Sequence, residues 1–385
     1  MKKGKGRKIG IGLILSALLV SACAAEKVPV ISESHEYWYT DQNSDSILMD
    51  GVLWTPTLDH HAILRMNTIT GESEIWDFAS EQALGEIKIR RITVVNERYL
   101  AIWLTASSDS TLPIAAKEFY FLEDESFIPA AVVIWDRSAG EIRDILKVPL
   151  EAAVHGINAY VITDNILRRI VLSQGFAINE NSFWDRVEGC EKVKVVSAVD
   201  KRLILQVAGN SEKETNSSEQ RYWIWNFASR LPDQWIEISF IPDFGAERAS
   251  VEYIGNRDNE LFFQTQNETG TLVFQAGANG IGQTQELGSL ANSQVCISET
   301  GYYYGTVLSA QSGTRAPGLL LMRKQGAETV VISEFQGGVS AEISPLGGYL
   351  LVQVQMENGQ IQQFLIHPVT KEKLCLQESS EAKAN

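Results

Sequence analysis

The sequence is poor in cysteine and in the short motifs that mark common catalytic centres. Only four cysteines occur in 385 residues, and no Cys-x-x-Cys, His-Glu-x-x-His, Gly-x-Ser-x-Gly or phosphate-binding glycine loop is present. Three cysteines lie beyond residue 23, so at most one disulfide can form among them. These absences argue against a disulfide scaffold, a paired-cysteine zinc site and a serine hydrolase with the usual nucleophile elbow.

Positive charge is scarce after the first few residues. A basic stretch at residues 2–8 is followed by an apolar run from Ile9 to Val20 and then by small residues, which is the layout of a secretory leader. The run is too short for a comfortable membrane span. Removing residues 1–22 takes away five of the 33 basic residues, which leaves 28 against 48 acidic residues and a net charge of −20. An acidic exported body argues against binding to nucleic acid and against docking on anionic lipid.

The end of this leader carries a recognisable motif. Val20-Ser21-Ala22-Cys23 resembles the lipobox of bacterial lipoproteins, in which the cysteine becomes the new N-terminus and carries the lipid. The resemblance implies that Cys23 is lipidated and that a membrane is one partner of the mature chain. We therefore expect a signal peptide at residues 1–22, a lipidated tether at residues 23–36, and a location on the extracytoplasmic face of a bacterial cell membrane.

One pattern recurs along the rest of the chain: an apolar pair, a polar or glycine turn, and then a strongly apolar strand. It starts near residues 46, 95, 154, 196, 253, 297 and 343, at steps of roughly 42 to 59 residues, which is the length of a β-propeller blade plus loop insertions. A second pattern follows most of these starts by about 20 to 40 residues: an apolar strand, a turn and another strand, as at residues 132–142. Glycine in these turns supplies the positive φ that tight hairpins require.

The two patterns predict an all-β chain, a β-propeller of seven blades with four antiparallel strands each, over residues 37–377. Six blades is the alternative, because the third repeat lacks a clear second half. Tyr37-Trp38-Tyr39 could add a strand that closes the ring, although the final repeat already contains four strands. Gln264, Gln353 and Gln355 are expected at strand edges or on the central channel, and residues 378–385 are expected to form a disordered tail.

The last repeat resembles a known propeller family. Ser344-Pro345-Leu346-Gly347-Gly348-Tyr349-Leu350 is similar to the Ser-Pro-Asp-Gly-x-x-Leu turn of the WD40-like, TolB-type repeats of exported bacterial proteins, with Leu346 where the family has Asp. Val133-Ile134-Trp135-Asp136 through Gly140-Glu141 is similar to the family's Asp-x-x-Thr-Gly-Glu hairpin. The resemblance implies an exported propeller that binds proteins, sugars or peptides, or that serves as an appendage of an enzyme. It carries over no catalytic residue.

Metal-binding patterns are weak, and we expect no metal and no cofactor. Asp41, Asn43 and Asp45 place oxygen side chains at alternate positions, as a calcium loop requires, but Ser46 stands where such loops have glycine. A solvated turn before the first blade explains them better. The pair His60-His61 could bind one metal only from a loop, because adjacent residues on a strand face opposite sides. A polar connection between two strands is the simpler interpretation.

Acid–base catalysis has one candidate cluster. Glu123-Asp124-Glu125 could hold an acid and a base of the kind that glycosidases use. Residues adjacent in sequence rarely flank one bond from opposite sides, so we interpret the cluster as loop charge.

Aromatic residues in long insertions are the more informative feature. Phe119, Tyr120 and Phe121 lie in one insertion, and Phe183 and Trp184 lie in another. Aromatic side chains in loops on a rigid scaffold are natural contacts for a partner, and the alternative is that they fold back over the edge of the ring. These residues favour a non-enzymatic, membrane-anchored scaffold that binds a protein or glycan partner. The alternatives are a propeller-type hydrolase or lyase acting on polysaccharide or peptide, and an accessory protein of envelope assembly.

Overall fold

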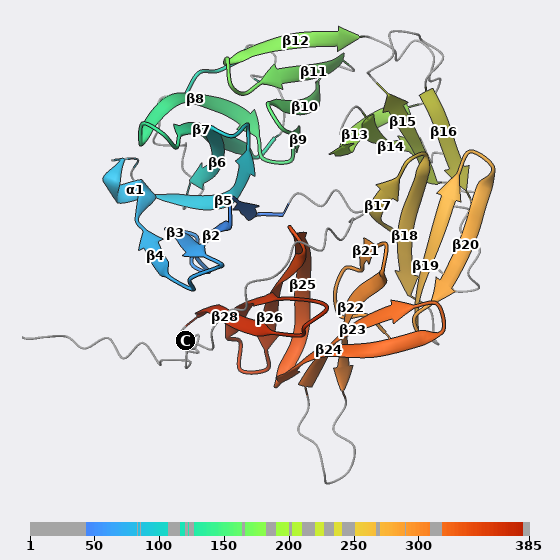
Figure 1. Cartoon of the computed structure of the whole chain (residues 1–385). Helices are drawn as coiled ribbons and strands as arrows, with labels where there is room; N and C mark the ends of the chain where they lie inside the picture. The colour runs from blue at the N-terminus through green and yellow to red at the C-terminus, as the bar shows by residue number, and fades with distance from the viewer. Residues whose placement is uncertain are drawn as a thin grey trace, which may run out of the picture.

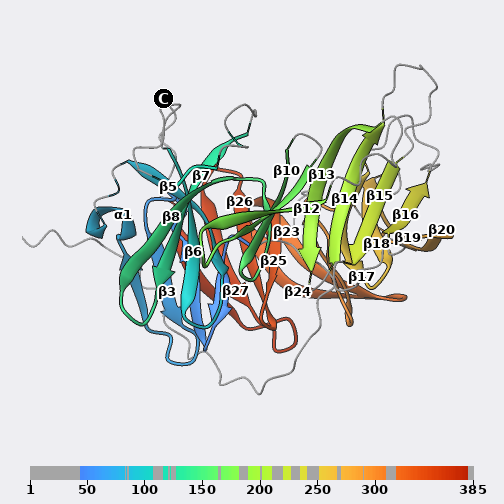
Figure 2. The ribbon, with the colours of Figure 1, turned by 90° about the horizontal axis from the view of Figure 1, so that it is seen from above.

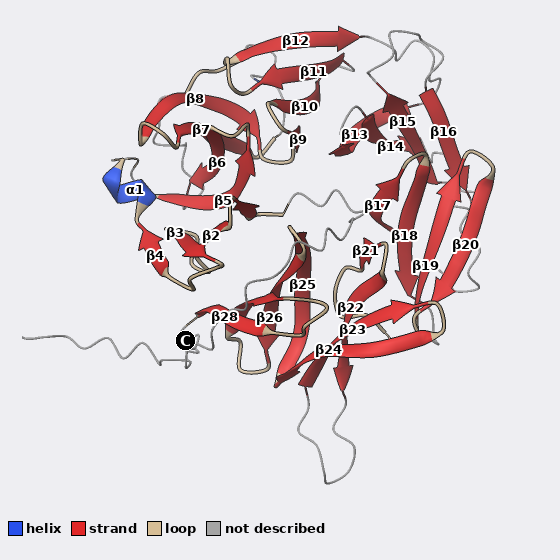
Figure 3. Cartoon of the chain, in the orientation of Figure 1, coloured by secondary structure: helices blue, strands red, loops and turns tan. Residues whose placement is uncertain are grey.

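Almost all of the regular structure is β-strand. The computed structural model describes residues 44–379 except for residues 83, 85, 107–115, 120–121, 123–126, 164–165, 182–189, 200–201, 210–219, 227–234, 241–250, 267–269, 289 and 309–317. Within the described part it contains strands β1 to β28 and a single helical turn, α1 (Phe78–Glu81), as Figure 3 shows. None of the described helical residues forms a segment long and apolar enough to cross a membrane.

The strands form seven consecutive groups of four, which we call blades 1 to 7. Blades 1 and 2 contain β1 (Ile47–Met49), β2 (Val52–Pro56), β3 (Ile63–Asn67), β4 (Ser73–Trp76), β5 (Ile87–Val94), β6 (Tyr99–Ala106), β7 (Pro129–Asp136) and β8 (Glu141–Pro149). Blades 3 and 4 contain β9 (Ala153–His155), β10 (Asn158–Thr163), β11 (Ile166–Val171), β12 (Phe176–Asn181), β13 (Cys190–Val199), β14 (Arg202–Gly209), β15 (Gln220–Asn226) and β16 (Trp235–Phe240). Blades 5 and 6 contain β17 (Glu252–Arg257), β18 (Glu260–Gln266), β19 (Thr271–Gly277), β20 (Gly280–Glu286), β21 (Cys296–Ser298), β22 (Gly301–Leu308), β23 (Gly318–Gln325) and β24 (Glu328–Gln336). Blade 7 contains β25 (Gly338–Leu346), β26 (Tyr349–Met356), β27 (Ile361–Ile366) and β28 (Lys373–Glu378).

Each blade is an antiparallel meander in which consecutive strands pair. The seven sheets stand around a common axis, with the first strand of each blade innermost (Figure 1). Turned by 90°, the ring shows its strands running from one end of the disc to the other (Figure 2). The predicted seven-bladed propeller is confirmed. The third blade does contain its second half, β11 and β12, which the sequence pattern did not reveal.

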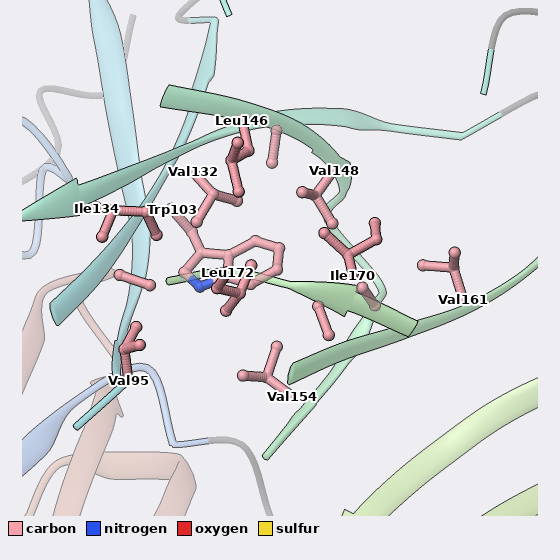
Figure 4. Close-up of a cluster of buried hydrophobic side chains, with 14 of the residues drawn as sticks. Val95, Trp103, Val132, Ile134, Leu146, Val148, Val154, Val161, Ile170 and Leu172 are labelled. Carbon is pink, nitrogen blue, oxygen red and sulfur yellow. The ribbon is translucent and has the colours of Figure 1, made fainter. Parts of the chain in front are cut away.

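The core lies between neighbouring blades. The second strands are buried almost throughout, as in β6, because a blade in the ring is covered on both faces. The outer strands are mostly exposed, as in β20, which explains why the second half of a repeat is harder to find in the sequence. Figure 4 shows the cluster between blades 2 and 3, in which Trp103 is fully buried among aliphatic side chains.

The ring closes between blade 7 and blade 1 through side chains. Leu53 and Met66 of blade 1 pack in one apolar cluster with Leu351 and Leu365 of blade 7. Nearer the other end of these blades, the Gln377 side chain donates to Pro56 O at 3.2 Å and accepts from Leu58 N at 3.0 Å. The strand that we expected at residues 37–39 lies outside the described residues, as do residues 1–36 and the end of the predicted tail.

Candidate functional site

A row of polar side chains crosses blade 7. Glu342, Gln353, Gln363 and Gln377 stand opposite one another on β25 to β28. Residues opposite each other on neighbouring strands share one face of a sheet. The Gln363 and Gln377 side chains donate to Thr55 Oγ1 at 3.4 Å and to Pro56 O at 3.2 Å, so this face looks toward blade 1.

A pocket opens between this row and blade 1, and we call it the seam pocket. Its enclosed space is small, about 50 Å³, and it opens into a wider hollow of about 470 Å³ that includes solvent. Residues from both sides of the junction line it: Ser44, Asp45, Ser46, Thr55, Pro56, Thr57, Leu58 and His60 of blade 1, and Glu342, Ser344, Leu351, Gln353 and Gln363 of blade 7. Its blade 7 residues come from β25, which is the innermost strand of that blade (Figure 1), and from β26 and β27.

The floor of the seam pocket is a closed hydrogen-bond network. Ser46 Oγ donates to Thr55 Oγ1 at 2.6 Å, and Thr55 Oγ1 donates to Pro56 O at 3.4 Å. Gln377 Nε2 donates to Gln363 Oε1 at 2.8 Å. Ser46, Thr55 and Gln363 are buried, so these bonds remove the cost of burying their polar groups. These hydroxyls and amides are therefore engaged, and Asp45 and Glu342 supply the carboxyl groups of the pocket.

The blade repeat itself brings the two carboxylates together. Met49 and Val52 flank the two-residue turn of blade 1, and Leu346 and Tyr349 flank that of blade 7. Both turns consist of residues with positive φ, as a two-residue hairpin requires. Asp45 precedes Met49 by four residues, and Glu342 precedes Leu346 by four. The two acids thus occupy equivalent positions on adjacent blades.

A raised pKa distinguishes the carboxyl group of Asp45. Asp45 is exposed as a whole residue, but its carboxyl group lies where the protein displaces most of the bulk water. This burial raises the pKa of Asp45 to about 6, with the negative charge of Glu342 adding to the rise and Arg91 opposing it. Glu342 is exposed. A carboxyl group with a raised pKa beside a second carboxylate is an arrangement suited to one acid and one base.

Asp45 should make the stability of the protein depend on pH. Because its pKa rises from 3.8 to about 6 on folding, the folded state binds more protons between these values, and stability falls as the pH rises through this window. Asn at this position cannot ionise. The free energy of unfolding of Asp45→Asn, measured by urea titration, should therefore increase relative to that of the wild type as the pH rises from 4 to 7. A difference that stays constant over this range would contradict the assignment.

The aromatic residues predicted to contact a partner are mostly outside the described part. Phe119 is described, and it is buried in the cluster between blades 2 and 3. Its position matches the alternative in which these side chains cover the ring. Tyr120, Phe121, Phe183, Trp184 and the predicted lipid-bearing Cys23 lie outside the described residues.

The structure describes some residues of the two weak metal-binding candidates. Asp41 and Asn43 lie outside the described residues, whereas Asp45 lines the seam pocket. His60 and His61 lie in the connection between β2 and β3 of blade 1, and their Nδ1 atoms lie 2.9 and 3.2 Å from the carbonyls of Ile89 and Ile87 on β5. Among the described residues, no group of three or more His, Cys, Asp or Glu side chains is arranged to hold a metal ion.

The sequence interpretation missed most of the seam pocket. Glu342, Gln363 and Gln377 were not singled out, and Gln353 was placed only at an edge or on the channel. Their signal was a polar residue at the same register position in each of four paired strands. That signal becomes readable only when the pairing of the strands is known.

Comparison with known proteins gives a likeness of fold. No family model matches the sequence, and no curated protein matches it significantly. A structure from a study of two prolyl endopeptidases is similar with a TM-score of 0.52 and 12% identity, over 90% of this chain and 51% of that one. The tricorn protease gives a TM-score of 0.48 and 10% identity over 91% of this chain and 36% of that one. Oligopeptidase B from Leishmania major gives a TM-score of 0.47 and 8% identity over 89% of this chain and 49% of that one.

At such low identity the likeness shows the β-propeller fold, and the chain spans about half or less of these structures. The finding nevertheless corrects the sequence-based prediction of a non-enzymatic scaffold, together with the preference for a chain without enzymatic activity. The structure with a TM-score of 0.52 comes from a study of two prolyl endopeptidases. The alternative prediction, a propeller-type hydrolase acting on peptide, agrees better with this finding.

Proposed function

We propose that the chain hydrolyses peptides, and that Asp45 and Glu342 of the seam pocket supply the acid and the base. The observation that carries the proposal is the pair of carboxylates at equivalent positions on adjacent blades, in one pocket, where the pKa of Asp45 is raised to about 6. The likeness of the fold to that of an endopeptidase supports peptide as the substrate class. The chain spans 51% of that structure, and the activity is proposed for this chain on the strength of its own pocket.

The proposed reaction needs one water molecule and two proton transfers. The Glu342 carboxylate takes a proton from water as the water oxygen attacks the peptide carbonyl carbon. Protonated Asp45 gives its proton to the peptide nitrogen, the carbon–nitrogen bond breaks, and an amine and a carboxylic acid leave. Glu342 then returns its proton to solvent, and Asp45 takes one up. Charge and atoms balance over the cycle.

Mass spectrometry of a mixture of unstructured peptides incubated with the purified chain tests the proposal. We expect new peptide termini that accumulate with time and with protein concentration. Intact peptides after prolonged incubation at pH 5 to 7 would refute it. A heat-denatured sample serves as the control for chemical breakdown.

We propose further that the mature chain acts on the extracytoplasmic face of a bacterial cell membrane, held there by a lipid on Cys23. The basic and apolar leader and the lipobox-like motif support this location. Cys23→Ser removes the thiol that would carry the lipid. Expressed in a bacterial host, the wild type should sediment with membranes and the variant should appear in the soluble fraction. An unchanged distribution would argue against the anchor.

A further inference from the structure

His60 enters the seam pocket from the connection between β2 and β3. Its backbone N–H donates to Thr57 O at 2.7 Å, and its backbone carbonyl accepts from Ile89 N at 2.7 Å. Its ring nitrogen Nδ1 lies 2.9 Å from Ile89 O. The residue is thus fixed to the first strand of blade 2 by both its backbone and its ring.

This contact determines the tautomer of the imidazole. A carbonyl oxygen only accepts hydrogen bonds, so Nδ1 must carry the proton that it donates to Ile89 O. In the neutral ring Nε2 then carries no hydrogen and is a hydrogen-bond acceptor. The ring of His60 also interacts electrostatically with Asp45.

The backbone of His60 has an uncommon conformation. Its φ of 63° lies in the left-handed region, which non-glycine residues rarely adopt and in which Asn, Asp and His are enriched. A strained residue that borders a pocket is a reason to look for a function there. Its neighbour Asp59 accepts from Thr57 Oγ1 at 2.6 Å and from His61 N at 3.1 Å, which stabilises the turn in this shape.

We infer that His60 is a further catalytic residue of the proposed hydrolysis, and that its Nε2 orients the attacking water. Water has two hydrogens: Glu342 removes one, and an acceptor for the other directs the oxygen lone pair toward the peptide carbonyl. His60 supplies this acceptor when its ring is neutral. The inference rests on the proposed function, because it assigns a role within the same pocket.

Two substitutions separate this role from a structural one. Asn tolerates a positive φ and carries an amide N–H that can replace Nδ1–H at Ile89 O, but it has no counterpart of Nε2. Glycine also tolerates the conformation and leaves space for free imidazole. His61→Asn is the matched control, because His61 contacts Ile87 O in the same way and does not line the pocket.

Steady-state cleavage of a peptide by these variants tests the inference. We expect His60→Asn to lower kcat on the order of 100-fold with little change in KM, because misplacing a reacting group has costs of this order. Added imidazole should restore part of the kcat of His60→Gly, and His61→Asn should remain within about twofold of the wild type, as expected of a surface substitution.

The contrary outcomes separate the role of His60 from the hydrolysis itself. Normal kcat in His60→Asn, or no response of folded His60→Gly to imidazole, would overturn the role of His60 while the proposed hydrolysis stands. An inactive wild type would overturn the hydrolysis itself, and the role of His60 with it.

Discussion

Asp45→Asn and Glu342→Gln each lower kcat/KM for peptide cleavage on the order of 100-fold or more, because each removes one of the two proton transfers of the reaction. Both replacements keep the size of the side chain, and both remove its ability to exchange a proton. The rates are measured with a fluorescence-quenched peptide. In the wild type the rate should also fall as the pH rises through about 6, because Asp45 must hold a proton before it can donate one.

Blade 5 provides a matched control for these variants. There Glu252 stands opposite Gln264, as Glu342 stands opposite Gln353 in blade 7. In blade 5 the pair is closed: Gln264 Nε2 donates to Glu252 Oε2 at 2.7 Å, and Gln264 Oε1 accepts from Val295 N at 2.8 Å. Glu252→Gln therefore removes an acid from the same level of another blade without altering the seam pocket. If it lowers cleavage as much as Glu342→Gln does, the effect does not arise from the pocket.

Trp103→Ala should cause the largest loss of stability, about 3 to 5 kcal/mol in the free energy of unfolding, which is typical for truncating a buried tryptophan. Trp103 is fully buried between blades 2 and 3 (Figure 4), and its indole N–H donates to Thr93 Oγ1 at 3.2 Å. The guanidinium of Arg91 lies over its ring at 3.9 Å, so the truncation also deprives a buried cation of its aromatic contact.

Urea titration of the variant measures this loss, and Trp103→Phe is the conservative control. Phenylalanine keeps an aromatic face and most of the volume, so its cost should be clearly smaller than that of alanine. A loss below about 1 kcal/mol for Trp103→Ala would show that the junction between blades 2 and 3 repacks easily, contrary to the close packing of a protein interior.

The fold could be predicted because each blade has its own local sequence pattern. A two-residue turn followed by a strand that is buried on both faces leaves a clear mark in the sequence, as at Asp50-Gly51 and Gly347-Gly348. Outer strands have a weaker apolar pattern in the sequence, because one side of each faces solvent. For this reason β12 was missed while β10 was recognised.

The candidate site could be predicted much less well. Asp45 and Glu342 are almost 300 residues apart in the sequence, and they meet only because the ring joins its last blade to its first. Asp45 was noticed, but as a weak calcium ligand, because its neighbours in sequence suggested a loop. The buried position of Phe119 was also hidden from the sequence, since an aromatic residue in an insertion can either meet a partner or cover the ring.

Cleavage of a defined peptide in water enriched in oxygen-18 tests the central claim most directly. Comparing the wild type with the double variant Asp45→Asn/Glu342→Gln, we expect the wild type to release fragments whose new carboxyl groups carry one heavy oxygen, and the double variant to leave the peptide intact. Labelled fragments in equal amounts from both proteins, or none from either, would contradict hydrolysis by these two carboxylates.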